Sequence, residues 1–413
     1  MSSKEKSIGK IPNSRKSHIP KLRFPGFDSE WELIKLKDFA NINPKSSELP
    51  STFNYVDLES VVDGQLVKRN EISKLDAPSR AQRVLQKNDV IFQMVRPYQK
   101  NNYYFDKEGF YVASTGYAQL RTDQDSMFLY QFLHNQNFVD KVIEKCTGTS
   151  YPAINSNDLG KIKFYYPTLN EQKSIGNFLK LIDFKIVTQK KTITHLETLI
   201  KTYIDQIFEQ KLSFNPNHEN WQMFKLEELG NTFNGLTGKT KEDFGSGKKF
   251  IQYKQIFDSP QIKMDDCGYV QINENENQQE VKYGDSFFTI SSETPNEIGM
   301  SSVLLDEVQD TFLNSFCFGF RFNSFAVLNP VFASFLFRSS LFRNQITKLA
   351  QGSTRYNMSK SEFLKISVEI PNEQEQTKIA GFLSKISEKI ETEKRILELL
   401  EQQKKYLLQN LFV

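Results

Sequence analysis

Two stretches of the chain carry a long, regular alternation of apolar and polar positions. Within residues 175–207, apolar residues recur at alternating spacings of four and three, and only Gln189 is plainly polar. Residues 379–411 repeat this rhythm, with polar residues at Glu393 and Lys404. Such spacing is the a/d pattern of a coiled coil. Each stretch of 33 residues therefore predicts a helix roughly 50 Å long.

The apolar seam of each helix needs a partner, and the simplest one is the seam of the other helix. The alternative is that each seam packs on its own domain as an ordinary amphipathic helix, but more than four heptads exceed a typical globular helix. The polar positions either fix the register or are solvated flanking positions. The predicted seam consists of Ile175, Leu179, Ile182, Ile186, Ile193, Leu196, Ile200, Ile207, Ile379, Leu383, Ile386, Ile390, Leu397, Leu400, Leu407 and Leu411.

The two helices close two halves of the chain that repeat each other. A block from Trp31 to Phe208 recurs loosely from Trp221 to Phe412. Duplication of this length predicts a pseudo-symmetric molecule with two similar sites. Positions matching at a constant offset of 204 include Pro167, Glu171, Gln172, Ile175, Phe178 and Leu179 with Pro371, Glu375, Gln376, Ile379, Phe382 and Leu383.

The sequence before each helix has a different character. Residues 89–96 and 285–290 are β-rich, and shorter apolar runs separated by Gly, Asn and Asp fill the remainder. The overall prediction is an α+β protein with two mixed α/β domains of roughly 140 to 150 residues. Similarity between the domains is confined to a few landmark pairs: Trp31 and Leu36 with Trp221 and Leu226, Asp89 with Asp285, Arg121 with Arg321, and residues 148–154 with residues 352–358.

Composition narrows the class of protein. At 413 residues and 38% hydrophobic content, the chain has room for two or three domains with their own cores. Three widely separated cysteines fit a reducing cytoplasm and give no structural zinc site. The first residues are polar and basic, which predicts a flexible tail and no signal peptide, and no apolar run has membrane-spanning length. A net charge of +3 is weak evidence for a nucleic-acid partner, so local charge has to carry that argument.

Three kinds of motif occur together along the chain, and their order and duplication identify a family resemblance. Residues 20–27 followed by Trp31, the two Gly-Thr/Ser loops and the two Pro-x-x-x-Glu-Gln helix starts resemble the specificity subunit of type I restriction-modification systems. The resemblance covers nearly the whole chain from Pro20 onward. It implies two target-recognition domains separated by two long antiparallel helices, with each domain reading one half of a split, asymmetric DNA sequence.

The resemblance also implies a division of labour. This chain would carry no catalytic activity and no cofactor. Two modification (methyltransferase) subunits would supply S-adenosylmethionine-dependent adenine methylation, and two restriction subunits would add ATP- and Mg²⁺-dependent translocation and cleavage. The expected segments are a basic tail (1–19), target-recognition domain 1 (20–166), a central spacer helix (167–212), target-recognition domain 2 (213–370) and a C-terminal spacer helix (371–413).

Clusters of cations interleaved with aromatic and amide side chains predict the DNA face, because cations neutralise phosphates while amides and rings reach bases. Any individual lysine of such a cluster fits a solvated loop equally well. The candidates are Arg69, Arg80, Arg83, Arg96, Tyr98, Lys100, Asn102 and Tyr103 in the first domain, and Lys239, Lys241, Lys248, Lys249, Tyr253 and Lys254 in the second.

The two glycine loops add a second set of candidates. Hydroxyl groups after a glycine can donate to phosphates or base edges, and an arginine can pair with guanine. The alternative is that Asn155 and Ser359 simply cap the helices that follow. The loop candidates are Thr149, Ser150 and Tyr151 in the first half and Ser353, Thr354, Arg355 and Tyr356 in the second.

No catalytic or metal-binding residue is predicted. Gly238-Lys239-Thr240 imitates the end of a phosphate-binding loop, but Phe233 stands where its first glycine belongs. Two other classes stay open. One is a self-contained restriction or methylation enzyme with an unrecognised active site. The other is a coiled-coil scaffold that does not bind DNA, which would lack the salt-dependent DNA binding expected of phosphate contacts.

Overall fold

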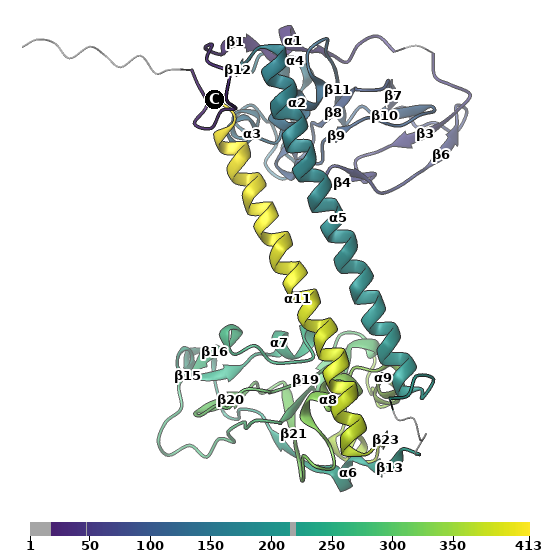
Figure 1. The fold of residues 1–413 in the computed structure, drawn as a ribbon, viewed down its shortest axis with the longest axis vertical. Helices are drawn as coiled ribbons and strands as arrows, with labels where there is room; N and C mark the ends of the chain where they lie inside the picture. The colour runs from purple at the N-terminus through teal and green to yellow at the C-terminus, as the bar shows by residue number, and fades with distance from the viewer. Residues whose placement is uncertain (1–17, 47, 215–219) are drawn as a thin grey trace, which may run out of the picture. The chain divides into compact units, whose positions relative to one another are not determined.

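The computed structural model describes residues 18–46, 48–214 and 220–413 (Figure 1). The chain forms two compact units: unit 1 comprises Met1–Lys190 with Arg395–Val413, and unit 2 comprises Lys191–Lys394. The division passes through both long helices, so each unit holds one mixed domain and one half of each helix. Residues 1–17 of the expected basic tail lie outside the described residues.

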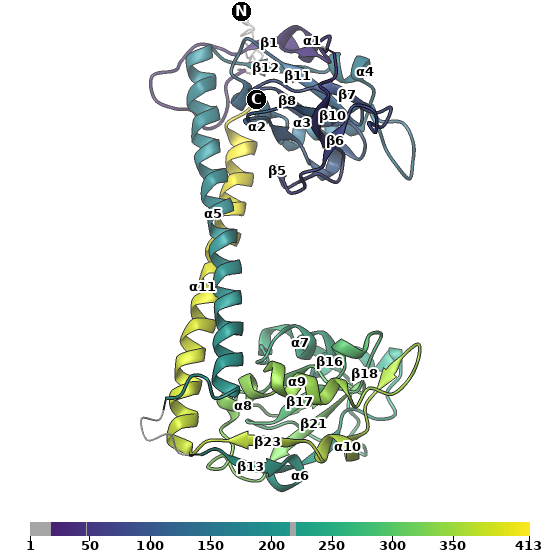
Figure 2. The ribbon, with the colours of Figure 1, turned by 90° about the vertical axis from the view of Figure 1, so that its right-hand side faces the viewer.

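Both predicted helices are present as α5 (Leu169–Phe208, 40 residues) and α11 (Glu373–Asn410, 38 residues). Each extends beyond the 33-residue seam, so each is nearer 60 Å than 50 Å at about 1.5 Å per residue. Figure 2 shows α5 as one continuous ribbon, and no proline interrupts either helix.

In unit 1 the N-terminal half of α5 packs against the C-terminal half of α11, which makes the pair antiparallel. The polar seam residue Lys404 lies 2.5 Å from Asp183 of α5, and Lys190 lies 3.2 Å from Glu401 of α11. One hydrophobic core holds the seam residues Ile175, Leu179, Ile182, Ile186, Leu397, Leu400, Leu407 and Leu411.

Unit 2 completes the seam with the opposite helix halves. Lys394 of α11 pairs with Glu197 of α5 at 2.8 Å. Ile200, Ile207, Ile379 and Leu383 belong to the core of this unit. Ile193 and Ile390 are also buried, while Leu196 and Ile386 are half-buried. The predicted pairing of the two helices is confirmed in each unit, and the alternative of two independent amphipathic helices is excluded.

The domain of unit 1 comprises, in chain order, β1 (Glu32–Lys35), α1 (Leu36–Phe39), β2 (Asn41–Ile42), β3 (Thr52–Val56), β4 (Val61–Val62), β5 (Gln65–Leu66), β6 (Glu71–Ser73), β7 (Ala81–Val84), β8 (Val90–Gln93), η1 (Pro97–Gln99), β9 (Tyr103–Tyr104), β10 (Tyr111–Ser114), β11 (Tyr117–Arg121), α2 (Ser126–Phe132), α3 (Gln136–Ile143), α4 (Ser156–Gly160) and β12 (Lys163–Tyr166).

The domain of unit 2 comprises β13 (Gln222–Lys225), α6 (Leu226–Leu229), β14 (Gly230–Asn234), η2 (Lys241–Asp243), β15 (Phe244–Ile251), α7 (Tyr253–Asp258), η3 (Met264–Asp266), β16 (Gly268–Val270), β17 (Ser286–Thr289), β18 (Ser291–Ser292), η4 (Pro295–Glu297), β19 (Ser301–Val303), β20 (Thr311–Leu313), β21 (Cys317–Phe322), α8 (Pro330–Leu336), α9 (Ser340–Thr347), β22 (Tyr356–Asn357), α10 (Lys360–Leu364) and β23 (Ser367–Ile370).

The two domains share a sheet topology. A four-stranded sheet is ordered β2-β11-β8-β9 in unit 1 and β14-β21-β17-β19 in unit 2. A second sheet contains one parallel pair in each unit, β3 with β10 and β15 with β20. A two-stranded ribbon, β1-β12 or β13-β23, joins the start of each domain to its end. The predicted α+β class and the predicted internal repeat are both confirmed.

The landmark residues form two equivalent ion pairs, Asp89 with Arg121 in unit 1 and Asp285 with Arg321 in unit 2. In each, the arginine donates from both Nε and a terminal nitrogen to the two carboxylate oxygens, at 2.6 to 2.8 Å. Each aspartate side chain is 1% exposed, and the pair ties the strand after a turn to its antiparallel neighbour. Removing the arginine would leave a buried aspartate without its counter-ion, so the pair stabilises the same strand contact in both halves.

The repeated glutamines at the helix starts are junction residues. The Gln172 amide donates to the carbonyl of Pro167 at 2.8 Å, and its oxygen accepts the backbone N–H of Asp125 at 3.2 Å. Gln376 repeats this arrangement with the carbonyl of its own proline and the N–H of Asn329, both at 2.9 Å. Asp125 and Asn329 are the N-caps of α2 and α8, so each glutamine joins the long helix to a domain helix.

The preceding glutamate anchors the entry of the chain into unit 1. Glu171 accepts two hydrogen bonds from the Arg23 guanidinium at 2.8 Å and one from the indole of Trp31 at 3.4 Å. Trp31 is 3% exposed and packs against Phe128 of α2 and against Phe412, which follows α11. The first and last described segments of the chain therefore meet in one core.

We expect Gln376→Leu to destabilise unit 2 by about 2 to 3 kcal/mol, because it leaves the partly buried Asn329 N–H and the buried Pro371 carbonyl without partners. The matched control is Gln374→Leu, because Gln374 is exposed two positions earlier on the same helix. Urea denaturation followed by circular dichroism would measure both. Equal midpoints for the two variants would show that the junction bonds contribute nothing.

Candidate nucleic-acid interface

The two glycine loops are equivalent β-hairpins. Thr147 and Ala153 exchange backbone hydrogen bonds of 2.9 and 3.0 Å in unit 1, and Gln351 and Asn357 exchange bonds of 3.0 and 2.8 Å in unit 2. The turn glycine of the second hairpin, Gly352, has φ +130°, and a Cβ there would lie 2.2 Å from a backbone oxygen. Glycine is therefore required by the turn, and the residues after it are carried at an exposed tip.

The helix-capping alternative is correct for the first hairpin. The Asn155 side chain accepts the N–H of Asp158 at 2.9 Å and begins α4. In the second, Ser359 precedes α10 without a side-chain cap and instead lies 2.7 Å from the Ser361 hydroxyl. Capping involves the residues after the hairpins, so it does not compete with a binding role for the tips.

The structure leaves most first-domain candidates accessible. Arg69, Arg80, Tyr98, Thr149, Ser150 and Tyr151 are exposed, while Arg83, Arg96 and Lys100 are partly buried. Lys100 donates to the carbonyl of His134 at 3.2 Å and to Gln136 at 2.8 Å, and burial lowers its pKa. Lys100 therefore has a structural role in the domain, which the neighbouring sequence does not indicate.

Two first-domain candidates have to be withdrawn. Asn102 is 1% exposed, and its side-chain oxygen accepts the Gln93 N–H at 3.0 Å. Tyr103 is 5% exposed and lies in a hydrophobic core, where burial raises the pKa of its hydroxyl. Both side chains are enclosed by the domain, so a base edge cannot reach them.

In the second domain, the exposed candidates are Lys241, Lys248, Lys249, Lys254, Ser353, Thr354 and Arg355, and Tyr253 and Tyr356 are partly buried. Lys239 is withdrawn because its side chain is only 4% exposed and lies 2.5 Å from Glu276. The hydrogen bond from Lys239 is the main reason that the pKa of the Glu276 carboxyl falls to about 2. Lys248 is paired with Asp310 at 2.7 Å but stays half-exposed.

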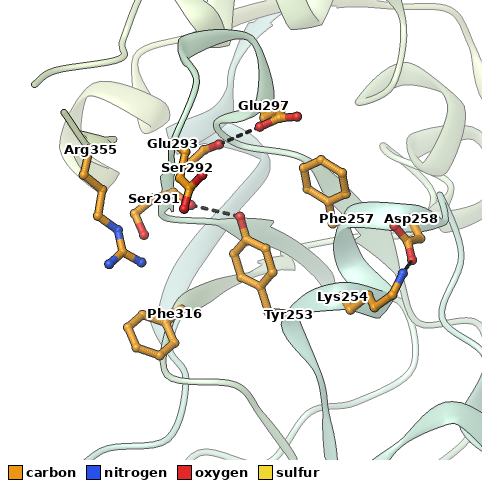
Figure 3. A pocket seen from close by; sticks show the side chains of 10 residues that line it. All are labelled: Tyr253, Lys254, Phe257, Asp258, Ser291, Ser292, Glu293, Glu297, Phe316 and Arg355. Atoms are coloured by element: carbon orange, nitrogen blue, oxygen red, sulfur yellow. Dashed lines mark hydrogen bonds and ion pairs between the residues drawn. The ribbon is translucent and has the colours of Figure 1, made fainter. Parts of the chain in front are cut away.

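A cavity of about 510 Å³ opens beside the second hairpin (Figure 3). Tyr253 lines it and donates its hydroxyl to the Ser291 carbonyl at 2.9 Å. Arg355 and Phe316 also line it, with the Arg355 guanidinium over the Phe316 ring, 5.8 Å from the centroid. Phe316 is 56% exposed, and sequence reasoning missed it because an aromatic residue beside a β-strand reads as core.

The described residues offer little for other chemistry. Across residues 18–46, 48–214 and 220–413, no group of three or more His, Cys, Asp or Glu side chains could hold a metal ion. No helix in these ranges is both long and apolar enough to cross a membrane. The three cysteines are free thiols, and burial raises the pKa of each.

One titratable group in unit 1 stands out. Burial, followed by the nearby Lys404 ammonium, lowers the pKa of His134 to about 4, although its ring is within 2.8 Å of the Tyr130 carbonyl. The folded state therefore binds this proton less readily than the unfolded chain, whose histidine has a pKa near 6.5. Stability contributed by neutral His134 is present above pH 6.5 and is lost as the pH falls toward 4.

We expect unit 1 to lose about 2 kcal/mol of stability between pH 7 and pH 4.5 through His134, after allowance for its partial exposure. His134→Gln should flatten that part of the profile, because glutamine stays neutral across the range. Urea unfolding at several pH values would test this, with hydrogen exchange of the α2 amides as the measure of stability of unit 1. An identical slope in the variant would assign the pH dependence to other groups.

Most of the chain matches a known protein family. A family model described as "Type I restriction modification DNA specificity domain" matches residues 28–198 and 218–402. The "Type I restriction enzyme MjaVIII specificity subunit" of Methanocaldococcus jannaschii is 23% identical over 419 residues, which cover 94% of this chain and 92% of the relative.

Solved structures agree on the fold. The "Type-I restriction-modification system S subunit from M. genitalium" aligns with a TM-score of 0.60 at 16% identity, covering 96% of this chain and 99% of its own. A chain described under "complex assembly" and "conformational transition of the type I R-M system" aligns with a TM-score of 0.58 at 19% identity, covering 94% and 98%. At these identities the likeness establishes a shared fold.

Proposed function

The chain belongs to the type I restriction-modification DNA specificity family, and we propose that it directs methylation and cleavage by partner subunits to a split, asymmetric DNA sequence. The observation that carries this proposal is the repeated domain. Both units keep the same sheet order, the same buried Asp–Arg pair and the same hairpin, while the exposed hairpin residues differ. A constant frame with different exposed tips suits two readers of different half-sites.

The exposed side chains suit DNA. Arginines and lysines on each domain can neutralise phosphates, and the hydroxyl groups at the hairpin tips can donate to phosphates or base edges. Phosphate contacts position a protein on DNA, whereas contacts to base edges carry the specificity. Binding of this kind weakens steeply with salt, which separates it from the alternative of a scaffold that binds no DNA.

Catalysis belongs to the partners in this proposal. The chain itself acts as a non-catalytic specificity subunit without a cofactor. Two methyltransferase subunits supply S-adenosylmethionine-dependent adenine methylation, and two restriction subunits supply ATP- and Mg²⁺-dependent cleavage. The helix pair offers a docking surface in unit 1, where Leu181, Phe184, Leu399 and Tyr406 are 56 to 69% exposed.

The paired helices also suit the role of a ruler between half-sites. A 40-residue helix of about 60 Å corresponds to roughly 18 base pairs at 3.4 Å per pair. That span accommodates two half-sites and an unread spacer. Spacer length then follows helix length.

The direct test of the proposed function is a methylation map. Co-expression of the chain with its methyltransferase subunit in a methylation-free host, followed by sequencing for N6-methyladenine, should reveal one split, asymmetric motif. The motif should vanish when this chain is omitted. Methylation that persists without the chain would contradict the specificity role.

The ruler is tested by inserting one heptad at facing positions in both α5 and α11. Seven residues add about 10 Å, or roughly three base pairs, so the unread spacer should lengthen by that amount or methylation should cease. The two half-site sequences should stay the same, because neither domain is altered. An unchanged spacer length would refute the ruler.

A further inference from the structure

Each unit stacks one arginine on an aromatic ring at its hairpin. In unit 1, Arg96 follows β8 and lies over Tyr151 of the hairpin tip, 4.2 Å from the ring centroid. In unit 2 the hairpin residue that aligns with Tyr151 is Arg355, and the ring is Phe316, from the loop before β21. Cation and ring have exchanged chain positions, yet both hairpins carry a guanidinium–ring stack.

These two guanidinium groups differ from a third that also stacks. Arg321 lies over Phe233 at 4.9 Å, but it is ion-paired with Asp285 and so belongs to the frame of the domain. Within the described residues, the guanidinium groups of Arg96 and Arg355 make no hydrogen bond and no ion pair. Nε of Arg96 is buried without a partner. A guanidinium held over a ring loses some of its freedom and keeps terminal N–H donors that can pair with a base edge.

The surroundings of Arg355 favour a base over a phosphate. The neighbouring cavity is lined by the carboxylates of Glu293 and Glu297, and by Asp258, which is paired with Lys254. Arg355 and Glu293 both line this cavity, and Figure 3 labels both side chains. Carboxylates repel phosphate, but they accept hydrogen bonds from the amino group of cytosine, the partner of guanine.

The walls of this cavity are held rigidly. Arg338 donates to the carbonyls of Ile256, Phe257 and Ser259 at 2.7 to 3.1 Å and so fixes the end of α7. Arg343 donates to the carbonyls of Asn296, Ile298 and Gly299 at 2.6 to 3.0 Å and so fixes the loop that follows Glu293. A site built on fixed walls loses little entropy when it binds, which favours selective reading.

We propose that Arg355, held over the ring of Phe316, donates two parallel hydrogen bonds to O6 and N7 of a guanine in the half-site read by unit 2. Arg96, held by Tyr151, reads a guanine in the other half-site in the same way. Phe316 and Tyr151 are positioning residues, because they act through the guanidinium. This inference rests on the proposed function, and it specifies that each half-site contains at least one G·C pair read by a stacked arginine.

The test compares methylation by the full chain with its methyltransferase subunits, using DNA duplexes in which each G·C pair of the motif is replaced in turn. Arg355→Lys keeps the charge but loses the planar pair of donors, so discrimination should fall roughly 10- to 100-fold at one G·C pair of one half-site only. Arg96→Lys should relax one guanine in the other half-site. Phe316→Leu should relax the same pair as Arg355→Lys, and Phe316→Tyr, which keeps the ring, should restore selectivity.

Several outcomes would overturn the inference without touching the proposed function. A wild-type motif that lacks a G·C pair in either half-site would do so at once. A uniform loss of rate in Arg355→Lys, with a shallower salt dependence and unchanged selectivity, would mark a phosphate contact instead. Complete loss of methylation would also contradict it, because Arg355 is exposed and has no structural hydrogen bond to lose. Failure of the proposed function is separate, since the wild-type chain would then direct no split motif.

Discussion

The need to bury one apolar seam along its whole length constrains most of this structure. The apolar seam of α5 and α11 is continuous with the hydrophobic cores of the domains. In unit 1, Ile175 and Leu179 share a core with Phe128 of α2, and in unit 2, Ile379 and Leu383 share one with Phe332 of α8. Each fully buried aliphatic side chain contributes on the order of 1.5 to 3 kcal/mol, so the domain and its helix halves are stabilised together.

Polar contacts then define the orientation of neighbouring elements, which hydrophobic burial alone does not determine. Hydrophobic packing is non-directional, whereas the bonds from Gln172 and Gln376 to the N-caps of α2 and α8 define how each domain helix meets its long helix. The Asp89 and Asp285 ion pairs do the same between strands. Because none of these groups belongs to a hairpin, the exposed tips can differ between the halves without breaking these contacts.

Patterns that depend on spacing were predictable from the sequence. The heptads predicted the helix pair, and the offset of 204 residues identified Gln172 and Gln376 as matching positions before their bonds were known. Partners distant in sequence were not predictable. Lys239 was predicted to be an exposed cation, because its partner Glu276 lies 37 residues away and local sequence does not indicate the contact. Asn102 was predicted to contact a base, but its side-chain oxygen accepts the backbone N–H of Gln93. Phe316 was missed for the opposite reason, because local sequence cannot distinguish an exposed ring from a buried one.

The core of unit 1 has a consequence for the order in which the protein matures. Trp31 packs against Phe412, and Leu22 donates its N–H to the carbonyl of Asn410, so the domain that precedes α5 is closed by residues at and beyond the end of α11. Unit 2 is one contiguous segment, residues 191–394. Domains usually complete themselves from the N-terminus while the chain is still on the ribosome. In this protein residues 191–394 precede residues 395–413, so unit 2 has its whole segment before unit 1 does, and removal of residues 395–413 would take core residues from unit 1 alone.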